Sequence, residues 1–145
     1  REMLTIACIV VLLDIFSDLQ LFLVMPMKSV FLRILEQKSK ILKDRYENPA
    51  LLAILPEYNT RLCHVGALLI SYRARFYEAM ETAAAKFHSQ FSGGVENFAL
   101  QYKTVSTVKD PFAPVSTLTE DLLNHLDRHY RAELETGQCL TGPHK

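Results

Sequence analysis

The pattern of apolar positions is most regular between Glu57 and Phe91, where hydrophobic side chains recur every three or four residues. The positions that follow this spacing are Tyr58, Leu62, Val65, Leu69, Tyr72, Phe76, Met80, Ala83, Phe87 and Phe91. This period predicts one long helix over 57–91 with a continuous apolar stripe. Small residues occupy its other side: Ala67, Ser71, Ala74, Ala85 and Ser89. Small side chains let a second helix approach closely, so we predict that the long helix is contacted from two sides.

Residues 4–25 are almost wholly apolar and long enough for a second helix, either buried in a protein core or embedded in a membrane. Asp14, Ser17 and Asp18 form one narrow polar strip on it, because positions i, i+3 and i+4 share a helix face. The ordinary polar composition downstream favours the core helix, while the membrane alternative stays open.

Helical spacing and stop signals divide the rest of the chain. They predict helices at about 27–46, 49–55, 95–103 and 118–135, the last starting at a capping box, Thr117–Glu120. We therefore expect an all-α fold, a single domain over 1–135 made of four to five helices around one long central helix. The residues 136–145 lack an apolar pattern and are predicted to form a flexible tail.

The charges of the chain balance, with 16 Lys and Arg against 16 Asp and Glu, so no overall positive field attracts nucleic acid. We therefore expect no nucleic-acid partner. Basic residues do gather on the predicted helix 27–46, at Lys28, Arg33, Lys38, Lys40 and Lys43. The favoured interpretation is a solvated face, and the alternative is contact with phosphates or acidic lipid headgroups.

The three cysteines, Cys8, Cys63 and Cys139, are widely spaced and form neither a metal-binding pair nor a disulfide framework. This spacing predicts a reducing, intracellular location. The chain starts at Arg1, which we interpret as a sign of a fragment or a processed protein.

Chemistry-bearing motifs are sparse. His125 and His129 are one helical turn apart and could ligate zinc, but no HExxH motif and no cysteine pair completes a site. Phosphate-binding glycine loops, nucleophile elbows and kinase signatures are also missing from the sequence. We expect no metal and no cofactor, and the balance leans against an enzyme.

The leading functional hypothesis is a non-catalytic interaction module, or a subunit or fragment of a larger protein assembly. Its expected partners are other protein subunits or a second copy of the chain, with membrane contact through residues 4–25 as a further option. The alternative is a helical domain that binds a lipid or acyl chain, and a metal-dependent enzyme comes third. The residues expected to bind a partner or ligand are Asp14, Asp18, Tyr72, Arg73, Arg75 and Phe76. For Arg73, at the edge of the apolar stripe, the favoured expectation is that its guanidinium reaches water, and the alternative is a pairing with Asp14 or Asp18.

Overall fold

The computed structural model describes residues 25–95 and 97–140. Their regular elements are a helix over 25–44, the 3-10 helix η1 (Pro49–Ile54), and the α-helices α2 (Leu55–Ser92) and α3 (Val115–Thr136). No strand occurs among these residues, so the all-α prediction is confirmed for them. The described part holds three α-helices and one 3-10 helix, and a bundle of four to five helices is therefore not confirmed.

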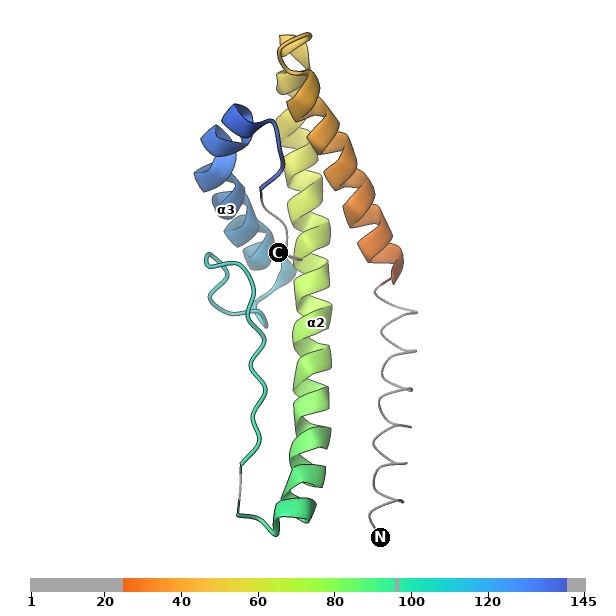
Figure 1. The fold of residues 1–145 in the computed structure, drawn as a ribbon, viewed down its shortest axis with the longest axis vertical. Helices are drawn as coiled ribbons and strands as arrows, with labels where there is room; N and C mark the ends of the chain where they lie inside the picture. Colours follow the sequence, from red (N-terminus) through yellow and green to blue (C-terminus); the bar gives the residue numbers. More distant parts are fainter. Residues whose placement is uncertain (1–24, 96, 141–145) are drawn as a thin grey trace.

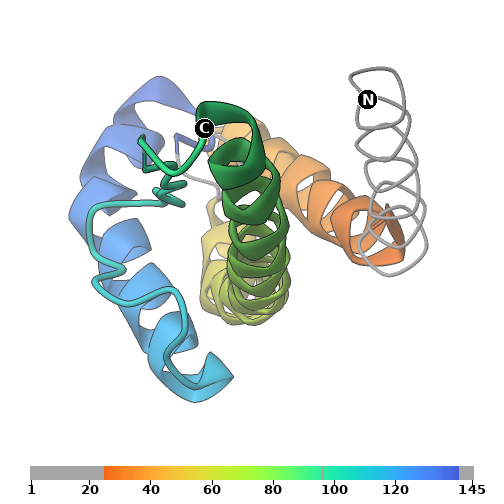
Figure 2. The ribbon, with the colours of Figure 1, turned by 90° about the horizontal axis from the view of Figure 1, so that it is seen from below.

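The long helix α2 forms the centre of the described part (Figure 1). The helix over 25–44 runs antiparallel to α2 on one side, and α3 lies on the other side. A view along the axis of α2 places it between these two helices (Figure 2). The connection from α2 to α3 first returns along the lower half of α2.

Both sides of α2 are packed against a neighbour. Leu62 and Leu69 form an apolar cluster with Phe31 of the helix over 25–44. On the opposite side, the row of small residues contributes Ala67, which is fully buried against α3. The α3 residues in this second cluster are Leu118, Leu122 and Leu126. The prediction that α2 is contacted from two sides is confirmed, and the small side chains let α3 pack closely.

Glycines end α2 and α3 in the same way. Gly93 and Gly137 adopt left-handed backbone conformations, with φ of 63° and 65°. Their amides donate to the carbonyl oxygens of Ser89 and Glu133, which would otherwise lack partners at the helix ends. At its other end, α3 begins at Val115, after Pro114, without a side-chain cap. The predicted capping box Thr117–Glu120 is wrong, because these residues already lie inside the helix.

The predicted helix over 95–103 is absent from the described residues of that segment, which have no regular secondary structure. The stretch instead follows α2 and is attached to it by side chains. The Tyr102 ring stacks on Tyr77 of α2 at a centroid distance of 5.3 Å. Tyr102 and Val105 also pack against the cluster between α2 and α3. The β-branched run TVSTV that follows Lys103 suits an extended chain better than a helix.

The predicted flexible tail is partly wrong. Leu140 donates its backbone N–H to Glu133 Oε1 at 3.0 Å, and Cys139 packs against two apolar clusters. Residues 137–140 are thus attached to the helices, although their sequence shows no apolar pattern. The predicted helix over 4–25 lies outside the described residues apart from Met25.

Candidate functional site

The outward face of the helix over 25–44 carries a cluster of exposed positive charges. Its inward face is held by Phe31, Ile41 and Leu42, which are buried against α2 and η1. A helix with one buried stripe turns the opposite side chains to solvent. Four exposed cations lie there, and Glu36 is the single exposed carboxylate of residues 25–44. The cations are Lys28, Arg33, Lys40 and Lys43, which together we call the basic face.

A shallow hollow of about 310 Å³ lies on the same side of this helix. Its lining residues are Leu32, Leu35, Glu36, Ser39, Lys40 and Lys43. Lys40 and Lys43 are three residues apart, so their ammonium groups lie on neighbouring turns at this end of the basic face. Two ammonium groups against the single Glu36 carboxylate leave the hollow with a net positive charge, which suits an anionic group such as a phosphate.

The fifth basic residue of the predicted face, Lys38, points the other way. Its side chain is fully buried, and Nζ lies 2.8 Å from Glu133 Oε2 of α3, which is also buried. The prediction that Lys38 belongs to a solvated face is therefore wrong. An ammonium group can be buried this completely only when a carboxylate is paired with it.

The residues predicted to bind a partner on α2 differ in their exposure to solvent. Tyr72 and Arg75 are exposed, whereas Arg73 and Phe76 are half-buried. Phe76 makes an edge contact with Tyr77 at a ring-centroid distance of 5.9 Å. Asp14 and Asp18 lie outside the described residues, so their proposed pairing with Arg73 stays a prediction.

The two histidines of α3 lie side by side, with ring centroids 4.5 Å apart. His129 Nδ1 is 2.8 Å from the backbone oxygen of His125, within its own helix. Burial, together with the positive charges of His129 and Arg128, lowers the pKa of His125 below its ordinary 6.5. Glu133, one helical turn after His129, is paired with Lys38. In residues 25–95 and 97–140 no group of three or more His, Cys, Asp or Glu side chains is placed to hold a metal ion.

Comparison with known proteins reveals a set of bacterial relatives. The chain is 34% identical over 123 residues to the DNA replication and repair protein RecF of Listeria welshimeri, and 33% identical over 123 residues to RecF of Listeria monocytogenes. Each match covers 81% of this chain and 31% of the relative. RecF of a Synechococcus strain is 27% identical over 129 residues, which cover 83% of this chain and 34% of the relative.

The chain thus spans about a third of the length of the curated relatives it matches. No protein-family model matches the chain. No solved structure matches it either.

These relatives overturn the functional predictions made from the sequence. Proteins named for DNA replication and repair contradict the expectations of an interaction module or assembly subunit, a lipid-binding domain and a metal-dependent enzyme. The same relatives contradict the prediction that nucleic acid is not among the partners of this chain. That prediction used the net charge of the whole chain, but balanced charges can still be segregated, and four exposed cations lie on one helix face.

The predicted membrane contact concerned residues 4–25, which lie outside the described residues apart from Met25. No helix within residues 25–95 and 97–140 combines the length and the apolar character needed to cross a bilayer.

Proposed function

We propose that this chain is a helical part of a DNA replication and repair protein related to RecF, and that its basic face contacts the DNA backbone. The observation that carries the proposal is the 34% identity over 123 residues to RecF of Listeria welshimeri. The position of the cations supports it, because the buried stripe of the helix over 25–44 presents all four of them to solvent.

The dimensions of the basic face suit a nucleic-acid backbone. From Lys28 to Lys43 the helix extends about 22 Å at 1.5 Å per residue. Duplex DNA carries about a dozen phosphates over such a length, at one charge per 1.7 Å of its axis. Contacts of this kind position a protein on DNA without reading the base sequence, so we expect affinity that is insensitive to sequence and sensitive to salt.

The test measures the affinity of the full chain for a fluorescein-labelled 20-base-pair duplex. Fluorescence anisotropy gives this affinity at several salt concentrations. Four phosphate contacts predict a loss of affinity of about a hundredfold between 50 and 200 mM salt. The double variant Lys40→Gln/Lys43→Gln removes two contacts, so the slope of log affinity against log salt should fall by about 2.

The matched control is Lys86→Gln/Lys109→Gln, which removes two exposed positive charges outside the basic face. This variant should bind like the unmodified chain. Equal losses in the two variants, or an affinity that does not change with salt, would contradict a role for the basic face.

A location inside the cell, in reducing surroundings, accompanies this proposal. DNA replication and repair, the roles in the relatives' name, take place where the DNA is. The buried thiol of Cys63 forms no disulfide with any described residue, as expected for a protein that stays in a reducing compartment.

A further inference from the structure

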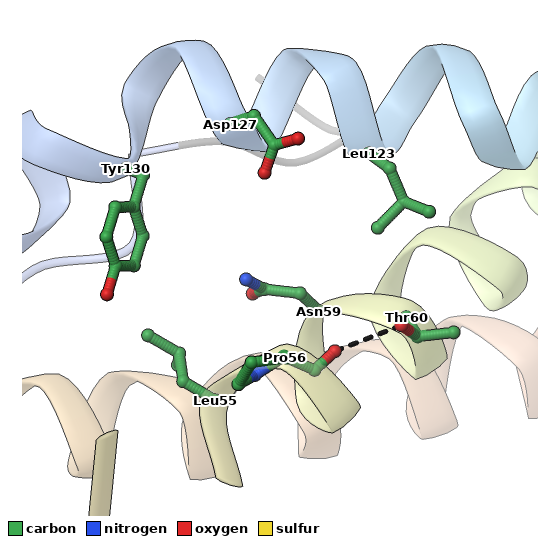
Figure 3. A pocket seen from close by; sticks show the side chains of 7 residues that line it. All are labelled: Leu55, Pro56, Asn59, Thr60, Leu123, Asp127 and Tyr130. Carbon is green, nitrogen blue, oxygen red and sulfur yellow. Dashed lines mark hydrogen bonds between the residues drawn. The ribbon is translucent and has the colours of Figure 1, made fainter. Parts of the chain in front are cut away.

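A cavity of about 280 Å³ opens between the first turns of α2 and the middle of α3 (Figure 3). Its lining residues are Leu55, Pro56, Asn59, Thr60, Leu123, Asp127 and Tyr130. The volume is close to the lower limit for pockets that bind small molecules. This cavity is distinct from the basic face, since none of the four cations lines it.

The packing of α3 explains why a cavity forms there. Leu118, Leu122 and Leu126 make one stripe of α3, and this stripe is buried against α2. Leu123, Asp127 and Tyr130 form the neighbouring stripe, at positions i, i+4 and i+7. This second stripe faces the start of α2 across the cavity. Leu55, at the start of α2, is buried in the cluster with the helix over 25–44. The result is an apolar floor with polar groups along its sides.

The polar groups of the cavity are mostly hydrogen-bond acceptors. Figure 3 shows the Asn59 amide of α2 and the Asp127 carboxylate of α3 projecting toward the same space from opposite sides. Asn59 Oδ1 is buried and accepts no hydrogen bond from any described residue. A buried acceptor without a donor is unfavourable, so a ligand that donates to it gains affinity. The Thr60 hydroxyl already donates to the Pro56 oxygen at 3.0 Å, which leaves only its acceptor side.

These groups favour a flat ligand with several hydrogen-bond donors, and they disfavour a phosphate. The two oxygens of the Asp127 carboxylate can accept two parallel hydrogen bonds, and a carboxylate disfavours an anion beside it. Tyr130 presents an aromatic ring at the rim, as side chains that stack on unpaired bases do. We propose that the cavity binds one unpaired guanine base of single-stranded DNA, an inference that rests on the proposed function.

Guanine fits the donor requirement better than the other bases. Its Watson–Crick edge carries N1–H and an N2 amino group side by side, which match the two oxygens of the Asp127 carboxylate. The second N2–H is then available to Asn59 Oδ1. Adenine and cytosine present a single amino group, and thymine presents one ring N–H. The sugar and phosphate stay outside, away from the charge of Asp127.

The experiment compares two fluorescein-labelled 11-mers, one of thymidines only and one with a single central guanosine, bound to the full chain. The guanosine 11-mer should bind about tenfold more tightly, the discrimination of one good bidentate contact. Asp127→Asn should abolish this preference and leave the thymidine 11-mer unaffected. Asp121→Asn, on the same helix but outside the cavity lining, is the matched control and should keep the preference. Tyr130→Leu should weaken both 11-mers and Tyr130→Phe neither, because only the leucine variant lacks a stacking ring.

The outcomes separate this inference from the proposed function. Equal affinity for the two 11-mers, or a preference that survives Asp127→Asn, would overturn the guanine site while duplex binding through the basic face still stands.

If the chain binds no DNA, the proposed function fails. The cavity is then tested with guanosine 5′-monophosphate by methyl NMR. Shifts confined to Leu55 and Leu123 would support the site. No shift, or an equal shift with thymidine 5′-monophosphate or with arginine, would overturn it.

Discussion

Lys38 and Glu133 form a buried ion pair, with Nζ 2.8 Å from Oε2 and both side chains at most 1% exposed. The residues are 95 positions apart in the chain and join the helix over 25–44 to α3. Glu133 also accepts the Leu140 amide through Oε1, so the same carboxylate holds the segment after α3. One buried charge pair therefore connects three parts of the fold.

Lys38→Met should lower the free energy of unfolding by about 3–5 kcal/mol, because it removes the ammonium group that neutralises the buried Glu133 carboxylate. The double variant Lys38→Met/Glu133→Met should recover most of that loss, since no charge is then buried alone. Urea unfolding followed by circular dichroism measures both values. Lys40→Met, which changes an exposed lysine two residues away, is the control and should stay within about 0.5 kcal/mol of the unmodified chain. Equal effects of Lys38→Met and Lys40→Met would contradict the buried pair.

Gly137→Ala and Gly93→Ala test the two helix ends against each other. Both glycines have positive φ, so alanine should cost about 1–2 kcal/mol at either position. Around Gly93 a Cβ would meet nothing within 4 Å, whereas at Gly137 it would lie 2.6 Å from Arg45 Nη1. Arg45 donates to the oxygens of Leu42 and Glu135 and would have to give up this arrangement. Thermal unfolding should therefore show the larger loss for Gly137→Ala, and equal losses would argue against a structural role of Arg45.

Cys63 should make stability depend on alkaline pH. Burial raises the pKa of this thiol from 9.0 to about 12, although the nearby Lys38 charge opposes the rise. Above pH 9 the unfolded chain loses this proton while the folded chain keeps it. The stabilisation is therefore complete below pH 9 and is lost toward pH 12, at about 1.4 kcal/mol per pH unit.

Urea unfolding between pH 8.5 and 10.5 should show this decline in the unmodified chain and in the control Cys139→Ala. In Cys63→Ala the decline in the free energy of unfolding should be smaller, because the ionisation of the Cys63 thiol no longer contributes to it. The same pH dependence in all three proteins would show that the Cys63 thiol does not resist ionisation.

His125 should make stability depend on acidic pH, and here stability should decrease as the pH falls. Its pKa lies below 6.5 in the folded chain, first because of burial and then because of the positive charges of His129 and Arg128, while Glu133 opposes the shift. As the pH falls through 6.5, the unfolded chain takes up this proton before the folded chain does, and stability decreases. His125→Gln should therefore lose less stability between pH 7 and pH 5 than the unmodified chain. Asn124→Gln, a change of a neutral exposed neighbour, should keep the original dependence, and thermal unfolding at the two pH values measures both.

The basic face could be located from the sequence, because a helical period separates its cations from the apolar positions. Its function could not, since contact with phosphates was an alternative to a solvated face and net charge argued against nucleic acid. The cavity had no signal in the sequence. Asn59 belongs to one helix and Asp127 to another, and only the packing of α3 on the start of α2 brings the two side chains to one space.

The sequence by itself determined the helical class, the long α2 and its two contact sides, because the spacing of apolar and small residues acts along a single helix. The tertiary structure decided which lysine is buried, where residues 97–105 run and how residues 137–140 are held. Those outcomes depend on partners distant in the chain. The amphipathic period marks Lys38 as one more solvated cation, and only Glu133, brought next to it by α3, makes its burial favourable.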